Sequence, residues 1–202
     1  DCTAMKQLEA WKTSRNRKPL IIRGAHQTGK TWLSEEFGRT RYEAMARIDL
    51  MNNERARSFF DGDLDVSRIL RNISLETGVP ITTDTLVLLD EIQECPRALT
   101  ALKYFCEDAR EYHVIATGSY MGIARHAGTS YPVGKVDTLT LRPMDFMEYL
   151  RAIGQGMMAD AISDGTGIAD LDSAKRDLRR EAGTTLLDMA VWVLFAPFTI
   201  LQ

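Results

Sequence analysis

The stretch Gly24-Ala25-His26-Gln27-Thr28-Gly29-Lys30-Thr31 decides the fold of this chain. It follows the apolar run 19–22 and precedes a segment, 32–37, with a helical pattern. A loop of this type between a strand and a helix is the context in which G-x-x-x-x-G-K-[ST] binds phosphate. The glycines let backbone N–H groups turn inward, and the helix adds unpaired N–H donors at its positive end. The stretch therefore predicts a phosphate-binding loop.

The residues of this loop have distinct expected roles around a nucleotide. Lys30 would reach the β- and γ-phosphates, and the Thr31 hydroxyl would bind Mg²⁺. The predicted nucleotide-binding residues are the whole loop and the next residue: Gly24, Ala25, His26, Gln27, Thr28, Gly29, Lys30, Thr31 and Trp32. The sequence has no Asn-Lys-x-Asp string for guanine recognition, which favours adenine as the base of the nucleotide.

A second motif, Asp90-Glu91, follows the apolar run 86–89. An acidic residue at the carboxyl end of a neighbouring parallel strand reaches Mg²⁺, usually through water. Glu91 is placed to deprotonate a water that attacks the γ-phosphorus. Ser119, which follows another apolar strand, is expected to hold that water or sense the γ-phosphate. The predicted catalytic residues are thus Glu91, Lys30 and Ser119, and the predicted metal ligands are Thr31 and Asp90.

Strand patterns alternate with helical patterns over the first 150 residues, which is typical of a parallel α/β sheet. We expect Gly38 to cap the helix after the loop and Gly118-Ser119 to break the fourth strand. The predicted strands are 19–23, 44–50, 85–90, 113–117 and 135–141. The predicted helices are a short one around residues 5–11 and then 31–37, 53–60, 66–75, 96–108 and 143–152.

Composition limits the class of protein. The net charge of -3 argues against a protein that mainly coats nucleic acid, so a nucleic-acid partner is not indicated. The three cysteines lack C-x-x-C spacing, which favours a reducing, cytoplasmic setting over a disulfide framework or zinc site. No apolar run reaches the ~18 residues that a membrane span needs. The sequence begins with Asp1, so we expect the natural start to lie upstream.

Four runs resemble a known family: RKPLIIRGAHQTGKTWL, LVLLDEIQECPRALTALKYFCED, YHVIATGSYMG and TSYPVGKVDTLTLRPMDFMEYL. They are similar to the AAA-type ATPase domain of prokaryotic ATP-binding proteins that carry a C-terminal domain of unknown function. The resemblance covers roughly 8–154 and implies a P-loop NTPase with an AAA-like sheet of five parallel strands and Mg-dependent ATP hydrolysis. By position it assigns Lys30 and Thr31 to Walker A, Asp90 and Glu91 to Walker B, and Ser119 to the sensor.

The sequence departs from this family in three places. His26 stands where the family usually has Arg, as a tolerated loop residue or as a titrating group near phosphate. Lys135 stands where many relatives carry a basic residue of uncertain role. Residues after Gly154 do not match the expected C-terminal domain. We therefore expect an AAA-like domain over 1–154 and, over 155–202, a linker and short helical appendage that is truncated, frame-altered or divergent.

The leading functional hypothesis is an Mg-dependent ATPase domain that acts as a motor or switch. One alternative is an ATP-gated interaction module with negligible turnover, and a weaker one is a P-loop kinase. The expected partner, besides ATP, is a second copy of the chain or the missing C-terminal domain. AAA-like sites commonly take an arginine from a neighbouring subunit, and Arg142 is the weak candidate for that role.

Overall fold

The computed structural model describes residues 3–25, 27–119, 123, 131–143, 150–151 and 154–163. The chain divides into two units, Asp1–Arg142 and Pro143–Gln202, and each is described by itself. In the second unit, Leu150 and Arg151 are helical and α8 spans Gly156–Ser163. The rest of the predicted helix 143–152 and the apolar run 189–201 lie outside the described residues. The predicted domain boundary after residue 154 stays a prediction.

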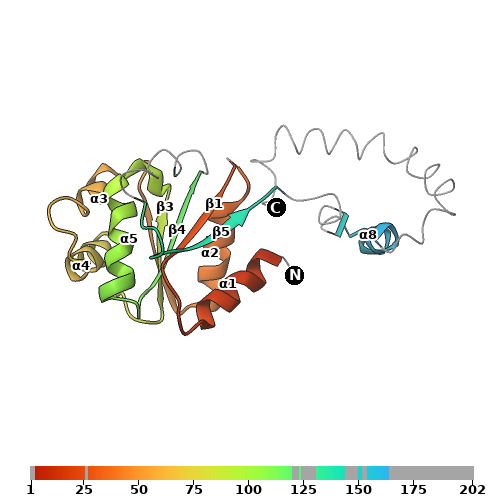
Figure 1. Cartoon of the computed structure of the whole chain (residues 1–202), viewed down its shortest axis with the longest axis horizontal. Helices are drawn as coiled ribbons and strands as arrows, with labels where there is room; N and C mark the ends of the chain where they lie inside the picture. Colours follow the sequence, from red (N-terminus) through yellow and green to blue (C-terminus); the bar gives the residue numbers. More distant parts are fainter. Residues whose placement is uncertain are drawn as a thin grey trace. The chain divides into compact units, whose positions relative to one another are not determined.

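The first unit is built on a five-stranded sheet in the order β2-β3-β4-β1-β5 (Figure 1). The strands are β1 (Leu20–Gly24), β2 (Ala44–Asp49), β3 (Thr85–Asp90), β4 (His113–Ser119) and β5 (Asp137–Leu141). Every neighbouring pair is parallel. The carboxyl ends of all five strands therefore lie along one edge of the sheet. This arrangement confirms the predicted α/β fold of the P-loop NTPase type.

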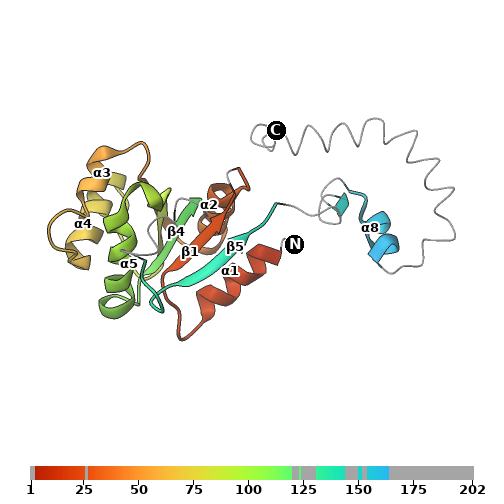
Figure 2. The same cartoon turned by 45° about the horizontal axis from the view of Figure 1, so that its top comes forward.

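Helices cover both faces of the sheet, as the two views of Figures 1 and 2 show. One face carries α1 (Thr3–Thr13) and α2 (Lys30–Arg41). The opposite face carries α3 (Glu54–Ser58), α4 (Val66–Thr77) and α5 (Pro96–Asp108). The first unit is thus a three-layer α/β/α structure.

Alternate residues of the strands feed two separate hydrophobic cores. In β1, Ile21 joins the core under α3, α4 and α5, whereas Leu20 and Ile22 join the core under α1 and α2. In β3, Val87 and Leu89 face the first core and Leu86 and Leu88 the second. Burial on both faces explains why the strands read as unbroken apolar runs.

Two sequence-based expectations about element ends are wrong. Gly38 does not cap α2, which continues to Arg41. Gly38 instead lies inside the helix. A Cβ at this position would approach the Met45 sulfur to 2.5 Å, so a glycine here lets α2 pack closely on β2. Likewise β4 is not broken at Gly118-Ser119, because both residues stay in register with the end of β1.

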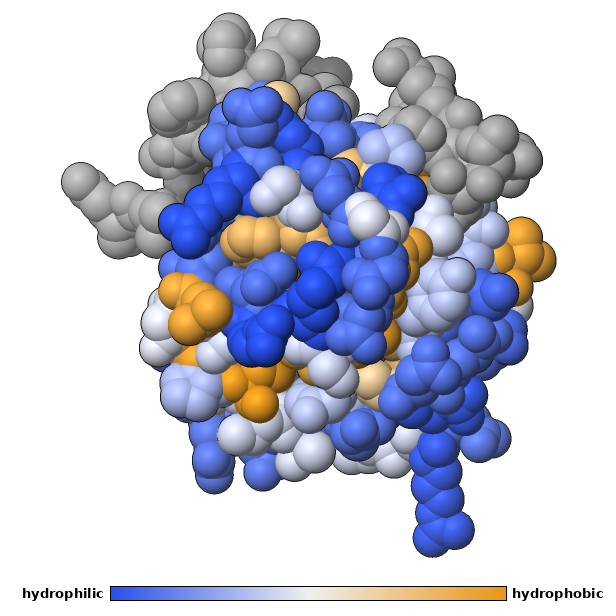
Figure 3. Space-filling view, turned by 90° about the vertical axis from the view of Figure 1, so that its left-hand side faces the viewer, coloured by the Kyte–Doolittle hydropathy of each residue, from blue (hydrophilic) through white to orange (hydrophobic). Residues whose placement is uncertain are grey.

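The outer face over α3, α4 and α5 is mostly hydrophilic, with apolar side chains scattered among polar ones (Figure 3). Leu75 of α4 is an exposed example. Within the described ranges, no helix combines the length and the apolar character required to cross a bilayer.

Candidate functional site

The predicted phosphate-binding loop connects the end of β1 to the start of α2. Gly29 has φ of 80°, a left-handed conformation that glycine adopts without strain, and α2 begins at the next residue. The Leu33 N–H donates to the Gly29 carbonyl at 2.9 Å, which closes the first helical turn. His26 lies outside the described residues. The loop therefore delivers Lys30 and Thr31 to the first turn of a 12-residue helix.

Lys30 is buried, with 6% of its surface exposed. Its Nζ donates to the Ala25 carbonyl at 2.7 Å and to the Gly24 carbonyl at 3.4 Å. Burial lowers the pKa of Lys30 below its usual value, and the charges of Glu91 and Asp90 offset part of this effect. The ammonium group is thus only partly compensated, and an anion held in the loop would complete the compensation.

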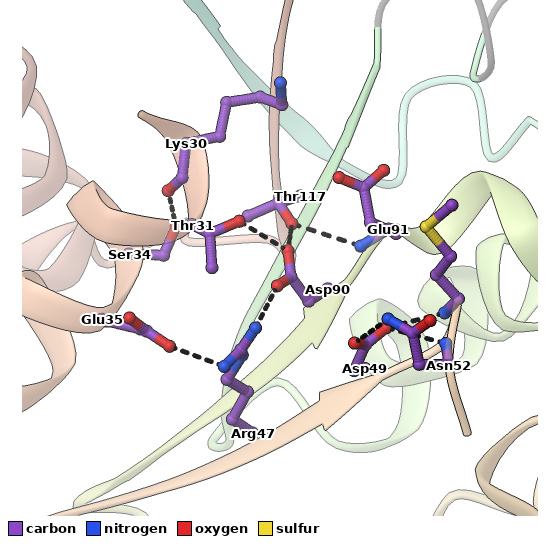
Figure 4. A network of polar contacts seen from close by, with 11 residues as sticks. Lys30, Thr31, Ser34, Glu35, Arg47, Asp49, Asn52, Asp90, Glu91 and Thr117 are labelled. Carbon is purple, nitrogen blue, oxygen red and sulfur yellow. Dashed lines mark hydrogen bonds and ion pairs between the residues drawn. The ribbon is translucent and has the colours of Figure 1, made fainter. Parts of the chain in front are cut away.

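Asp90, at the end of β3, accepts hydrogen bonds from three other elements (Figure 4). Its Oδ1 accepts from the Thr31 hydroxyl of α2 at 3.0 Å and from the Thr117 hydroxyl of β4. Its Oδ2 accepts from the Arg47 guanidinium of β2 at 2.7 Å. Asp90 itself is only 3% exposed. These donors compensate a carboxylate whose burial would otherwise be costly.

Arg47 links Asp90 to α2. Its second terminal nitrogen contacts the Glu35 carboxylate at 2.9 Å, so a continuous ion-pair chain runs from α2 through β2 to β3. Burial opposes the charge of Arg47, but the hydrogen bond and charge of Asp90, followed by Glu35 and Asp49, raise the pKa of Arg47 above its usual value. Arg47 therefore stays cationic and fixes the orientation of the Asp90 carboxylate.

Glu91 follows Asp90 in an unusual backbone conformation. Its φ of 53° lies in the left-handed region, which costs a residue with a Cβ roughly 1–2 kcal/mol. Its N–H contacts the Thr117 hydroxyl at 3.4 Å, and its carboxylate accepts a hydrogen bond from the side-chain amide of Gln93. Strained residues that their surroundings hold in place concentrate at functional sites.

The remaining residues that the sequence analysis singled out lie at four separate places in the first unit. Ser119 ends β4 and pairs in register with Gly24, so it lies at the same edge of the sheet as the loop. Trp32 is in the first turn of α2 and is half-exposed. Arg142 is exposed directly after β5. Lys135 forms an ion pair with Glu107 at 2.8 Å, and this contact links the segment before β5 to α5.

Sequence reasoning missed three residues at this edge: Arg47, Thr117 and Gln93. Arg47 and Thr117 are polar positions in otherwise apolar or alternating strands, and their side chains reach Asp90 from the two strands that flank β3. A polar residue inside a buried strand near an acidic motif was the available signal. Gln93 carried no such signal, because its position depends on the turn that follows Glu91.

A hollow of about 900 Å³ lies elsewhere, between the segment 62–70 and α5. Its lining includes Asp63, Asp65, Asp108 and Glu111 but no residue of the loop. The one arginine in the lining, Arg97, already donates to the Phe60 carbonyl at 2.6 Å. This acidic lining disfavours a polyanion, so the hollow is not the candidate nucleotide site.

The pair formed by Thr31 and Asp90 suits a magnesium ion. Mg²⁺ prefers hard oxygen ligands, keeps several waters, and is usually bound by one or two carboxylates together with substrate phosphates. The Thr31 hydroxyl and the Asp90 carboxylate supply such oxygens 3.0 Å apart, next to the predicted phosphate loop. The chemistry of the donor set therefore fits Mg²⁺ with a nucleotide.

The chain is similar to known proteins in sequence and in fold. A profile of the AAA domain family matches residues 16–150. The structure of Drosophila ORC bound to DNA is similar over 75% of this chain and 45% of that chain, with a TM-score of 0.52 and 15% identity. The Aeropyrum pernix ORC1 protein in complex with DNA is similar over 74% and 46%, with a TM-score of 0.48 and 14% identity.

The chain thus spans a little under half the length of these two structures. The likeness to the Drosophila protein concerns the fold alone. No curated protein matches the sequence.

Proposed function

The chain belongs to the AAA domain family, and we propose that it binds Mg-ATP and hydrolyses the β–γ phosphoanhydride bond. The nucleotide would lie on the loop 24–31, with Thr31 and Asp90 as the protein's oxygens for Mg²⁺. Glu91 would act as the general base. This assignment extends the family membership to a particular site and reaction.

The observation that carries the proposal is the contact between Thr31 and Asp90 at 3.0 Å, with the buried ammonium of Lys30 on the same loop. One motif therefore supplies a cation for phosphate, and two motifs about sixty residues apart meet to supply hard oxygens for a metal. A chance glycine-rich turn would not place its threonine hydroxyl against a buried carboxylate at the end of another strand.

The residues can divide the reaction as follows. Glu91 takes a proton from a water, the water oxygen forms a bond to the γ-phosphorus, and the bond from that phosphorus to the β–γ bridging oxygen breaks. Lys30 exchanges its loop carbonyls for phosphate oxygens and so opposes the negative charge of the polyphosphate. Bound Mg²⁺ would neutralise charge on the β- and γ-oxygens. Ser119, at the end of β4, would contact the water or the γ-phosphate.

The test is Glu91→Gln, measured by phosphate release and by equilibrium binding of Mg-ATP. We expect turnover to fall by roughly 10²–10⁴-fold, the scale of losing a general base, while binding persists. The matched control is Glu94→Gln, because Glu94 is exposed and lies three residues away. Wild-type turnover in Glu91→Gln would show that another residue activates the water. Binding without turnover in the unsubstituted chain would instead indicate a nucleotide-gated module.

The proposal includes help from a neighbouring molecule. An arginine supplied across a subunit interface contributes roughly 10³–10⁵-fold in rate in P-loop enzymes. Arg142 is exposed and is the candidate that the sequence offers. We therefore expect slow hydrolysis by the monomer and a specific activity that rises with protein concentration. Fast, concentration-independent hydrolysis by a monomer would remove the need for an arginine in trans.

A further inference from the structure

The side chain of Gln93 joins the proposed general base to the strand that ends at Ser119. Its Nε2 donates a hydrogen bond to the Glu91 carboxylate, and its Oε1 accepts the Ser119 N–H at 3.3 Å. An ionised carboxylate can only accept hydrogen bonds, so the amide must turn its nitrogen toward Glu91 and its oxygen toward Ser119. Both ends of the amide are therefore used, and its orientation is fixed.

The backbone is shaped to admit this side chain. A Cβ at Gly118 would lie 2.5 Å from Gln93 Oε1, closer than real contacts allow. Glycine at position 118 thus leaves the space that the amide fills. Gln93 also belongs to the short 3₁₀ turn Ile92–Glu94, which begins directly after the left-handed Glu91. The turn, the glycine and the amide together hold Glu91 from one side.

We propose that Gln93 is a positioning residue that holds the Glu91 carboxylate for attack by water and ties it to the end of β4. The inference rests on the proposed ATPase function. Gln93 touches neither the nucleotide loop nor Asp90 in its described contacts, so it acts through Glu91. The same amide connects Glu91 to the Ser119 backbone, so a displacement at the sensor end of β4 is passed to the base.

This role predicts a change in kcat with little change in KM. Loss of the amide would let the Glu91 carboxylate move while the loop, Lys30, Thr31 and Asp90 stay in place. A misplacement of about 1 Å in a catalytic group costs on the order of 10²-fold in rate. A residue that only stabilised the fold would lower the amount of folded protein and leave the rate per folded molecule unchanged.

The first test is Gln93→Met, with Gln7→Met in the exposed part of α1 as the matched control. We expect kcat to fall on the order of 10²-fold in Gln93→Met, KM and Mg-ATP affinity to change less than about threefold, and the control to behave as wild type. Gln93→Glu keeps an acceptor for the Ser119 N–H but faces Glu91 with a like charge. It should lose kcat similarly, and it decides the question if Gln93→Met fails to fold.

Two further variants approach the same contact independently. Gly118→Ala should displace the amide and lower kcat like Gln93→Met, whereas Gly156→Ala, where the added Cβ would meet nothing within 4 Å, should not. In a Glu91→Gln background, Gln93→Met should have almost no additional effect on kcat, because residues that act as one unit are not additive.

The outcomes separate the two claims. If the unsubstituted chain releases no phosphate from ATP, the proposed function is wrong, and this inference falls with it. If the unsubstituted chain hydrolyses ATP and Gln93→Met and Gln93→Glu retain its kcat, only the role of Gln93 is wrong. Full additivity of Gln93→Met with Glu91→Gln would likewise overturn the claim that Gln93 acts through Glu91.

Discussion

Lys30 is the residue whose environment points most directly to an anionic ligand. It is a buried cation that donates to carbonyls of its own loop, and burial lowers its pKa despite two nearby carboxylates. Phosphate oxygens would offer it stronger, charged acceptors in place of neutral carbonyls. A bound phosphate would therefore be a stronger acceptor for Lys30 than the two loop carbonyls to which it donates.

Lys30→Ala should weaken Mg-ATP binding by roughly 10–100-fold, because a hydrogen bond to a charged group contributes about 1.5–3 kcal/mol. Calorimetric titration of the variant beside wild type measures this directly. Lys103→Ala, which removes an exposed lysine of α5, is the matched control. Equal affinities in all three proteins would refute the assignment of the loop.

A substitution of Arg47 tests whether the buried Asp90 carboxylate depends on hydrogen-bond donors from several elements. Arg47→Met should lower the free energy of unfolding by roughly 1–3 kcal/mol, because the Asp90 side chain is 4% exposed and would lose its charged partner. Arg39→Met removes a guanidinium that is 71% exposed and paired within its own helix, so it should lower the free energy of unfolding much less than Arg47→Met does. Urea unfolding compares the two. A similar small loss in both would mean that the hydroxyls of Thr31 and Thr117 suffice.

At the scale of elements, a ring cluster joins α1, the end of α2 and the start of β4. The His113 Nδ1 lies 2.6 Å from the Tyr42 hydroxyl, and both rings make edge-on contacts with their neighbours. Trp11 packs against His113 and donates its indole N–H to the Lys18 carbonyl at 2.8 Å. Burial, followed by the charges of Arg17 and Lys12, lowers the pKa of His113 to about 4. The folded protein therefore holds His113 neutral.

This pKa predicts how stability depends on pH. An unfolded chain protonates histidine near pH 6.5, whereas the folded chain resists protonation down to about pH 4. Acidification through this window therefore favours the unfolded state, and from about pH 7 to about pH 5 His113 should cost about 2 kcal/mol of stability. Urea unfolding of wild type and His113→Gln at both pH values isolates this contribution, since all other groups titrate alike. If the two proteins lose the same stability, His113 is not held neutral.

The elements were largely predictable because their signals are local. The apolar run 86–89, flanked by Thr85 and Asp90, predicted β3, and Pro96 marked the first turn of α5. The errors at Gly38 and Gly118 share one cause: glycine also serves close approach in tertiary packing, and the sequence does not distinguish that use from a cap or a break. Local propensity was overridden where two elements pack closely.

At the scale of the molecule, the site forms where the carboxyl ends of parallel strands meet. Lys30, Thr31, Asp90 and Glu91 could be predicted because each belongs to a motif that follows a recognisable strand. Partners such as Arg47 and Thr117 become neighbours only through the strand order and register, which no local pattern encodes. The sequence therefore indicates the proposed chemistry, while the structure supplies the groups that orient it.

The first unit should fold and bind nucleotide by itself. Among the residues that the structure describes, every member of both hydrophobic cores lies before Arg142, and so do the loop, Asp90 and Glu91. A domain of this size buries enough surface, about two thirds of what its unfolded chain exposes, to be stable alone. We therefore expect a fragment of residues 1–142 to unfold cooperatively, with a midpoint close to that of the whole chain, and to bind Mg-ATP with similar affinity.

A fragment of residues 1–136 is the matched control for this prediction. It lacks β5, which pairs with β1 along its whole length from Leu20 to Gly24. Loss of β5 would expose the edge of β1, the strand that leads into the phosphate loop. We therefore expect this shorter fragment to lose both cooperative unfolding and nucleotide binding. Circular dichroism melting and calorimetric titration of the two fragments beside the whole chain provide the comparison. If 1–142 is unfolded while the whole chain is folded, residues after 142 contribute to the stability of the first unit, and the cores described here do not account for it.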